Sequence, residues 1–161
     1  MTERLVHPFD PVYDASSRVL ILGSFPSVIS RQQSFYYANK NNRFWPVLSS
    51  LFEEEIPAAN EDRKRFCLAH HIALWDVIHA CSIKGSSDAS ITDAEANDIA
   101  SLLKKTKISI IFTTGKKASD LYDQYINVPL PKIALPSTSS ANARMRLPDL
   151  KEAYSIIKEY V

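Results

Sequence analysis

The residues best suited to chemistry begin in the stretch LILGSFPSVISRQQSFYYANKNNRFWPVL, residues 20–48. An apolar run ends at Gly23, and the turn after it would expose the backbone amides of Ser24 and Phe25 as donors to a carbonyl oxygen of a heterocycle. GSFPS lacks the G-x-S-x-G pattern of a nucleophile elbow and the lysine and second glycine of a phosphate-binding loop. An ordinary strand-to-helix turn is the alternative interpretation.

A run of aromatic and amide residues follows this turn. Of Tyr36 and Tyr37, we expect one to pack inward and the other to face a pocket, where its ring could stack on a base. Asn42 could hold a water molecule or a base edge, or it could simply cap the helix that follows. Arg43 is expected at the solvated surface.

Two further polar segments follow apolar runs. In LWDVIHACSIKGSSD, Asp76 is expected to fix the turn after its strand rather than to react, and Asp88 could reach the pocket. In LPSTSSANARMR, residues 135–146, the hydroxyl groups and backbone amides suit phosphate contact. A flexible connection that caps the last helix is the alternative. The candidate DNA contacts of this segment are Ser137, Thr138, Ser139, Asn142 and Arg144.

These segments need a scaffold that brings them together. Continuous Val, Ile and Leu runs predict parallel strands covered on both faces, near 18–22, 72–75, 108–113 and 131–135. Threefold and fourfold apolar spacing predicts helices at 42–53, 61–71, 93–105, 115–125 and 148–159, with Asp93 and Asp149 at two of their N-termini. The alternation predicts an α/β fold, with the three polar segments at the carboxyl edge of one sheet.

Composition limits the class of protein. The chain has 161 residues, 45% of them hydrophobic, which suits a single domain over 1–161. A net charge of +1 argues against a binder that relies on bulk positive charge, although a local basic rim could still hold phosphates. Two cysteines are too few for a disulfide framework, and we find neither a signal peptide nor a membrane-spanning run. We expect a cytoplasmic monomer.

The sequence resembles the uracil-DNA glycosylase superfamily, and within it the hypoxanthine-DNA (deoxyinosine) glycosylase branch. GSFPS, YYANKNNRFW, LWDV and LPSTSSANAR correspond, in order, to the branch patterns G-S-x-P-G, Y-Y-A-x-x-x-N-x-F-W, L-W-D-V and L-P-S-T-S-x-A-N. The first piece departs at its end, where Ser27 replaces the usual last glycine. Each piece alone is weak, but the ordered set covers most of the chain. The NRFW tetrapeptide is also shared with the mismatch-specific uracil-DNA glycosylases.

The resemblance implies a three-layer α/β/α sandwich around a four-stranded parallel sheet. It also implies a monofunctional enzyme, with no metal or cofactor, that turns a deaminated base out of damaged DNA and hydrolyses its N-glycosidic bond. In mismatch-specific relatives an asparagine of the first motif positions the attacking water, and Phe25 stands at that position. By resemblance Asn42 is catalytic, Tyr37 stacks on the base, and residues 135–146 grip phosphates, with Ser137 and Ser139 as the main contacts.

Two functions of other classes stay open on the sequence. One is a noncatalytic nucleic-acid or nucleotide-binding module on the same fold, which the substitution at Phe25 favours. The other is a hydrolase of free nucleosides. A zinc site built from Cys67, His70, His79 and Cys81 is disfavoured because the spacing of these residues is irregular.

Overall fold

A four-stranded parallel sheet forms the centre of the protein. The computed structural model describes residues 3–161, so the first two residues of the domain expected over 1–161 lie outside it. The strand order is β3-β2-β6-β7. The strands are β2 (Val19–Gly23), β3 (Ile72–Asp76), β6 (Ile110–Thr114) and β7 (Lys132–Leu135). All four predicted strands are therefore confirmed to within two residues, as is the parallel arrangement.

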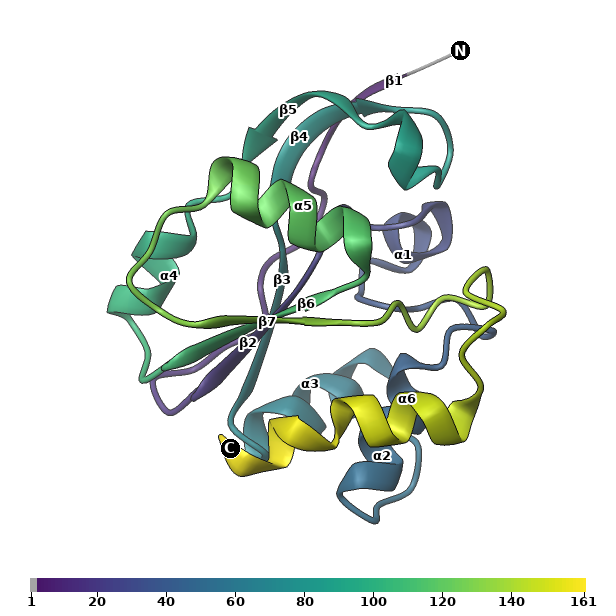
Figure 1. Cartoon of the computed structure of the whole chain (residues 1–161), viewed down its shortest axis with the longest axis vertical. Coiled ribbons are helices and arrows are strands. Elements are labelled where there is room, and N and C mark those ends of the chain that lie inside the picture. The colour runs from purple at the N-terminus through teal and green to yellow at the C-terminus, as the bar shows by residue number, and fades with distance from the viewer. Residues whose placement is uncertain (1–2) are drawn as a thin grey trace.

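Both faces of this sheet are covered, which explains why its strands read as unbroken apolar runs. Val19 and Ile21 pack into one core cluster, whereas Leu20 and Leu22 pack into another on the opposite face. Figure 1 shows α2, α3 and α6 on one side of the sheet and α4 and α5 on the other. The expected three-layer α/β/α sandwich is confirmed.

The helices mostly follow the predicted spacing. They are α1 (Val28–Gln33), α2 (Phe44–Leu51), α3 (Asn60–Ala69), α4 (Ile99–Lys104), α5 (Lys116–Tyr125) and α6 (Leu147–Tyr154), with 3₁₀ turns η1 (Asp88–Ser90) and η2 (Ser155–Glu159). The sequence did not predict α1, which is only six residues long. Asp149 accepts a hydrogen bond from the Arg146 backbone N–H, as expected of an acid in the first turn.

The helix predicted over 93–105 is wrong in its first half. Residues Thr92–Ala96 form strand β5, which pairs with β4 (Ile78–Ile83), and β4 pairs on its other side with β1 (Glu3–Val6). Exposed and half-buried residues alternate over most of β5, but its Thr-Asp-Ala-Glu-Ala sequence has no alternation of apolar and polar side chains that would predict a strand. Asp93 lies inside this strand at φ 52°, and the N-cap of α4 is Asp98 instead.

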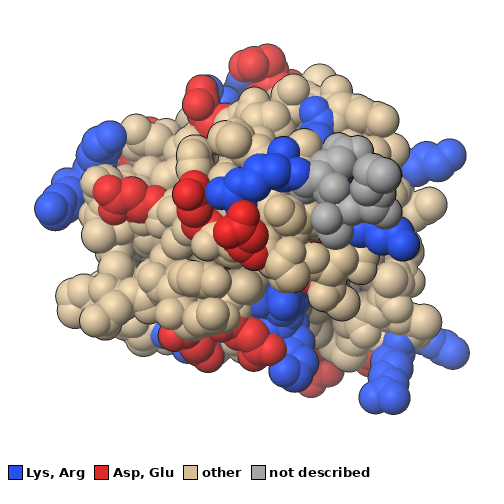
Figure 2. All heavy atoms as spheres, turned by 90° about the horizontal axis from the view of Figure 1, so that it is seen from above, with Lys and Arg blue, Asp and Glu red and all other residues tan. Residues whose placement is uncertain are grey.

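Charges are mixed on the face that lies above this antiparallel sheet. Figure 2 shows acidic and basic side chains interspersed there, with large uncharged areas between them. Arg4 contributes by pairing with Asp93 and Glu95, at 3.3 and 3.4 Å. This face therefore does not present a continuous basic surface. Within residues 3–161, no helix is long and apolar enough to cross a lipid bilayer.

Candidate active site

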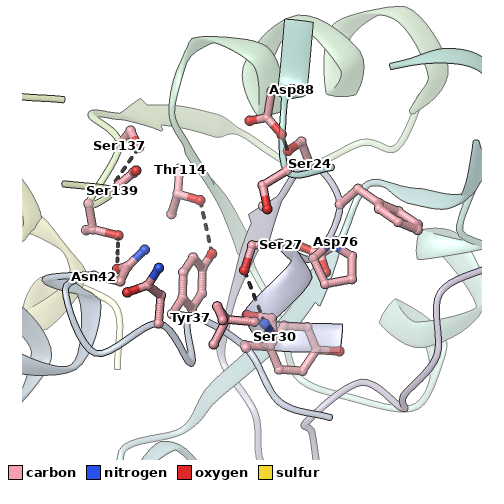
Figure 3. A pocket seen from close by; sticks show the side chains of 18 of the residues that line it. Ser24, Ser27, Ser30, Tyr37, Asn42, Asp76, Asp88, Thr114, Ser137 and Ser139 are labelled. Carbon is pink, nitrogen blue, oxygen red and sulfur yellow. Dashed lines mark hydrogen bonds between the residues drawn. The ribbon is translucent and has the colours of Figure 1, made fainter. Parts of the chain in front are cut away.

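A cavity of about 230 Å³ opens where the parallel strands end. Gly23 and Asp76 are the last residues of β2 and β3 and pair in the ladder, while Thr114 is the last residue of β6. Figure 3 shows Asn42, Ser137 and Ser139 on one side, Ser24 and Asp88 on the other, and Tyr37 and Thr114 between them. The three polar segments thus meet at one sheet edge, as predicted.

The first wall is the turn after β2. A Cβ on Gly23 would lie 2.6 Å from Asp76 Oδ1, so only glycine permits this close approach. Ser24 and Phe25 both line the cavity, and Phe25 is 6% exposed. Within the described chain, neither of their backbone N–H groups donates a hydrogen bond. Two amide donors are therefore available at this wall.

Tyr37 forms an aromatic wall of the cavity. Its ring stacks on Phe44, with centroids 3.8 Å apart and planes 14° apart. Its hydroxyl group donates to Thr114 Oγ1 at 3.0 Å, because Thr114 in turn donates to the Leu22 carbonyl. Burial, and then the charge of Asp76, raise the pKa of Tyr37 well above 10.0, so the phenol stays a neutral donor.

The backbone holds Tyr37 in a strained conformation. Its φ of 53° lies in the left-handed region, which is unfavourable for a bulky side chain. Neighbouring contacts fix the chain on both sides: Ser30 Oγ accepts from the Ala38 N–H at 3.2 Å, and Trp45 Nε1 donates to the Tyr36 carbonyl at 3.2 Å. Tyr36 is 2% exposed, so the expectation that one tyrosine packs inward is confirmed.

Asn42 lies just before Arg43, the N-cap of α2, and also lines the cavity. Its Oδ1 accepts from the Phe44 N–H at 2.9 Å and from Thr138 Oγ1 at 2.8 Å. A backbone N–H can donate only to an acceptor, so the atom that faces the Phe44 N–H is the amide oxygen Oδ1, and the other terminal atom is the nitrogen Nδ2. Nδ2 makes no hydrogen bond within residues 3–161, so Asn42 offers the cavity a donor.

The last wall is the strap, residues 136–146, which follows β7. Arg43 organises it: its guanidinium group donates to the carbonyl oxygens of Thr138, Ser139, Asn142 and Met145. The expectation that Arg43 is a solvated surface residue is therefore wrong, because its five N–H groups bind several carbonyl oxygens of the strap at once. Tyr154 adds a hydrogen bond to the Pro136 carbonyl at 2.6 Å.

The strap divides its predicted contacts between two places. Ser137, Thr138 and Ser139 line the cavity. Asn142 does not, and its Nδ2 instead donates to the Ser137 carbonyl at 3.0 Å, which braces the strap. Arg144 is exposed and lines a separate shallow surface depression, outside the cavity.

Asp88 reaches the site from the loop before β5, as predicted. Its Oδ1 accepts from Ser24 Oγ at 2.8 Å, although the residue is exposed on its outer side. Desolvation of the carboxyl group raises the pKa of Asp88 above 3.8, while the Ser24 hydrogen bond partly opposes that rise. Asp88 thus belongs to the wall formed by the turn after β2.

Sequence reasoning missed the role of Asp76. Its side chain enters the cavity and its Oδ2 lies 2.7 Å from His7 Nε2, rather than fixing the turn. The turn is instead held by Asn97, whose Nδ2 donates to the Asp76 carbonyl at 2.9 Å. The position of Asp76 at the end of a predicted strand was the available signal, but nothing in the sequence joined it to His7. Thr114 and Asn39 also line the cavity without having been predicted.

The cysteines lie away from the cavity. Cys67 and Cys81 are buried and unpaired, and burial raises the pKa of the Cys67 thiol far above its usual value. In residues 3–161, no three His, Cys, Asp or Glu side chains gather in a group that could hold a metal ion.

Comparison with known proteins agrees with this arrangement. Residues 11–158 match the model of the Uracil DNA glycosylase superfamily. A Hypoxanthine DNA glycosylase of Methanosarcina acetivorans is 36% identical over 138 residues, which cover 84% of this chain and 87% of that protein. A Hypoxanthine DNA glycosylase of Methanosarcina barkeri is 32% identical over 139 residues, with the same coverage of 84% and 87%.

A solved structure shares the whole architecture. The solution NMR structure of a candidate uracil DNA glycosylase from Methanosarcina acetivorans superposes with a TM-score of 0.78 at 32% identity. The match covers 96% of this chain and 98% of the other, so the likeness extends over nearly the whole fold.

Proposed function

Because the chain belongs to the Uracil DNA glycosylase superfamily, we propose that it excises hypoxanthine from DNA by hydrolysing the N-glycosidic bond. The proposal includes uracil and xanthine as further deaminated substrates. One observation carries it: Tyr37, Asn42 and the strap all line a single cavity. An aromatic ring, an amide donor and a row of hydroxyl groups together suit one planar base and the phosphates that flank it.

The cavity supports a base that has been turned out of the duplex. Extrusion costs a few kcal/mol, and less for a mispaired base. Stacking on an aromatic ring returns about 1–3 kcal/mol, and the stacked Phe44 keeps Tyr37 in place behind it. The strap then binds the phosphates of the DNA backbone, since Ser137 and Ser139 present hydroxyl groups and LPSTSSANAR contains no acidic residue that would repel a phosphate.

The proposed chemistry relies on stabilising the departing base. As the bond between C1′ and the base nitrogen breaks, the electron pair leaves with the base and the oxygen of a water molecule bonds to C1′. The proton that this water loses neutralises the base anion, so the products are the free base and an abasic sugar. Asn42 Nδ2 and the amides of Ser24 and Phe25 would donate to the developing anion. The side chain of Phe25 cannot hold water, so Phe25 packs against its neighbours and catalysis falls to these donors.

A strand-cleavage assay tests the proposal and separates it from its rivals. Labelled duplexes that contain inosine, uracil or xanthine are incubated with the protein and then cleaved with alkali at any abasic site. We expect strand breaks with wild type and far fewer with Asn42→Ala. The control Asn41→Ala should cleave as wild type does, because its side chain is exposed and lies outside the cavity.

The other outcomes identify the alternatives. Duplex binding without strand breaks would indicate the noncatalytic binding module. Hydrolysis of free inosine, without action on the duplex, would indicate a nucleoside hydrolase.

A further inference from the structure

His7 lies just after β1 in a closed aromatic box. Its side chain is 2% exposed, and its ring centroid lies 4.7 Å from that of Phe9 and 6.0 Å from those of Phe25 and Tyr36. Its backbone N–H donates to the His79 carbonyl at 2.6 Å, which fixes the chain to β4. The imidazole therefore has little freedom to turn.

The partners of the ring determine where its protons lie. His7 Nδ1 is 2.8 Å from the Phe9 carbonyl, which can only accept, so Nδ1 carries a proton. His7 Nε2 is 2.7 Å from Asp76 Oδ2. A close contact between these two atoms requires one further proton, held either by Nε2 or by Oδ2. In both cases the proton lies on the line between Nε2 and Oδ2.

Asp76 lines the cavity, and since its Oδ2 contacts the buried His7, Oδ1 is the oxygen left to face the cavity. Asp76 Oδ1 lies 2.6 Å from the point where a Cβ of Gly23 would stand, and the Tyr37 hydroxyl lies 3.4 Å from the same point. Within residues 3–161, no group donates a hydrogen bond to Oδ1. Because the proton of the pair lies between Nε2 and Oδ2, Oδ1 remains an acceptor only.

We propose that His7 is a specificity-determining residue, which positions Asp76 so that Oδ1 accepts the ring N–H of the extruded base. This inference rests on the proposed function. Hypoxanthine and uracil carry an N–H beside a carbonyl group, whereas adenine and cytosine carry a lone pair on that ring nitrogen. An acceptor facing that lone pair is repelled and left unpaired. The pair thus distinguishes hypoxanthine from adenine and uracil from cytosine.

The titratable groups around Asp76 favour a carboxylate whose Oδ2 is held by His7 and whose Oδ1 accepts from the base. Besides His7, the titratable groups that face Asp76 are Tyr36 and Tyr37, from the loop after α1, and Asp88, from η1. Both phenols stay neutral, because burial raises their pKa well above 10.0. His7 is therefore the group placed to compensate a charge on Asp76. An asparagine in place of Asp76 could turn its amide and donate instead, which would weaken the discrimination.

Three histidine variants test the inference. His7→Phe keeps a ring in the box but removes both nitrogens; His7→Gln keeps an N–H that can donate to Asp76 Oδ2. His79→Phe is the matched control, since its side chain is exposed on β4. For each, we would measure the single-turnover rate on an inosine duplex as a function of pH. Binding of a duplex with an abasic analogue gives a second measurement that involves no base.

Without its partner, the buried Asp76 carboxyl group in His7→Phe should take up a proton, which Oδ1 can then carry. We expect a loss of about 10²-fold at neutral pH, comparable to the loss of one preorganised hydrogen bond. The loss should shrink as the pH rises and removes that proton. We expect His7→Gln to stay within about tenfold of wild type, and all variants to bind the abasic analogue equally.

Each result decides a separate question. Wild-type protein that releases no hypoxanthine refutes the proposed function. If wild type is active, two results refute the inference alone. One is a pH profile of the His7→Phe rate that runs parallel to that of wild type at every pH. The other is a His7→Gln rate as low as that of His7→Phe. If His7→Phe does not fold, the isosteric Asp76→Asn replaces it, and calorimetry measures the binding of the bases hypoxanthine and adenine. The ratio of the affinity for hypoxanthine to that for adenine should be at least tenfold below the wild-type ratio. An unchanged ratio overturns the inference.

Discussion

Replacing Asn42 with aspartate separates its two structural functions. The Oδ1 contacts with the Phe44 N–H and Thr138 Oγ1 use acceptor capacity that a carboxylate retains, whereas the Nδ2 donor is lost. A negative charge at the start of α2 also suits the helix dipole. We therefore expect the free energy of unfolding of Asn42→Asp to stay within about 0.5 kcal/mol of wild type.

Activity should respond in the opposite way. Loss of one preorganised donor to a developing anion costs about 10²–10³ in rate, or roughly 2.7–4 kcal/mol, and the introduced charge would add to that loss. Single-turnover cleavage of an inosine duplex and urea denaturation measure the two quantities. Asn42→Ala, which also loses the Oδ1 contacts with the Phe44 N–H and Thr138 Oγ1, should be about 1 kcal/mol less stable than wild type. Asn42→Asp that retains wild-type rate would refute the assignment of Nδ2 as a catalytic donor.

Other regions of the site give further expectations. Arg43→Leu removes the donors that hold the strap, so its melting temperature should fall by several degrees, corresponding to about 1–3 kcal/mol, and its duplex affinity should weaken in a binding titration. Gly115→Ala should destabilise by about 1–3 kcal/mol in urea denaturation, because φ is 94° and the new Cβ would lie 3.2 Å from Ser137 Cβ. Burial raises the pKa of Asp88 in the folded state, so the folded protein binds this proton more tightly than the unfolded chain. The contribution of Asp88 to stability should therefore fall as pH rises above 3.8 through the raised pKa, and Asp88→Asn should remove that slope in urea denaturation.

The central sheet was predictable because its signal is local. Runs such as Val19–Gly23 are apolar throughout, and only burial on both faces accounts for them. Strand β5, in contrast, is composed of Thr-Asp-Ala-Glu-Ala and pairs at the edge of a second sheet, so its conformation depends on β4 rather than on its own residues. The predicted helix over 93–105 failed for that reason.

The same distinction applies to the site. Tyr37, Asn42 and Ser137 could be found because each carries a distinctive side chain beside a recognisable element. The first two lie before or at the start of the predicted helix over 42–53, and Ser137 follows the predicted strand over 131–135. The contacts that organise them are non-local: Arg43 binds carbonyl oxygens about a hundred residues away, and His7 meets Asp76 across 69 residues. Sequence spacing gives no information about such pairs, since only the folded topology brings them together.

The most direct measurement of the central claim is a crystal structure of Asn42→Asp bound to a duplex that contains inosine. We predict that hypoxanthine lies outside the base stack, inside the cavity at the ends of β2 and β6, with its ring against Tyr37 and the strap on the flanking phosphates. A complex in which the base stays stacked in the duplex, or in which DNA binds another face and leaves the cavity unoccupied, would contradict it.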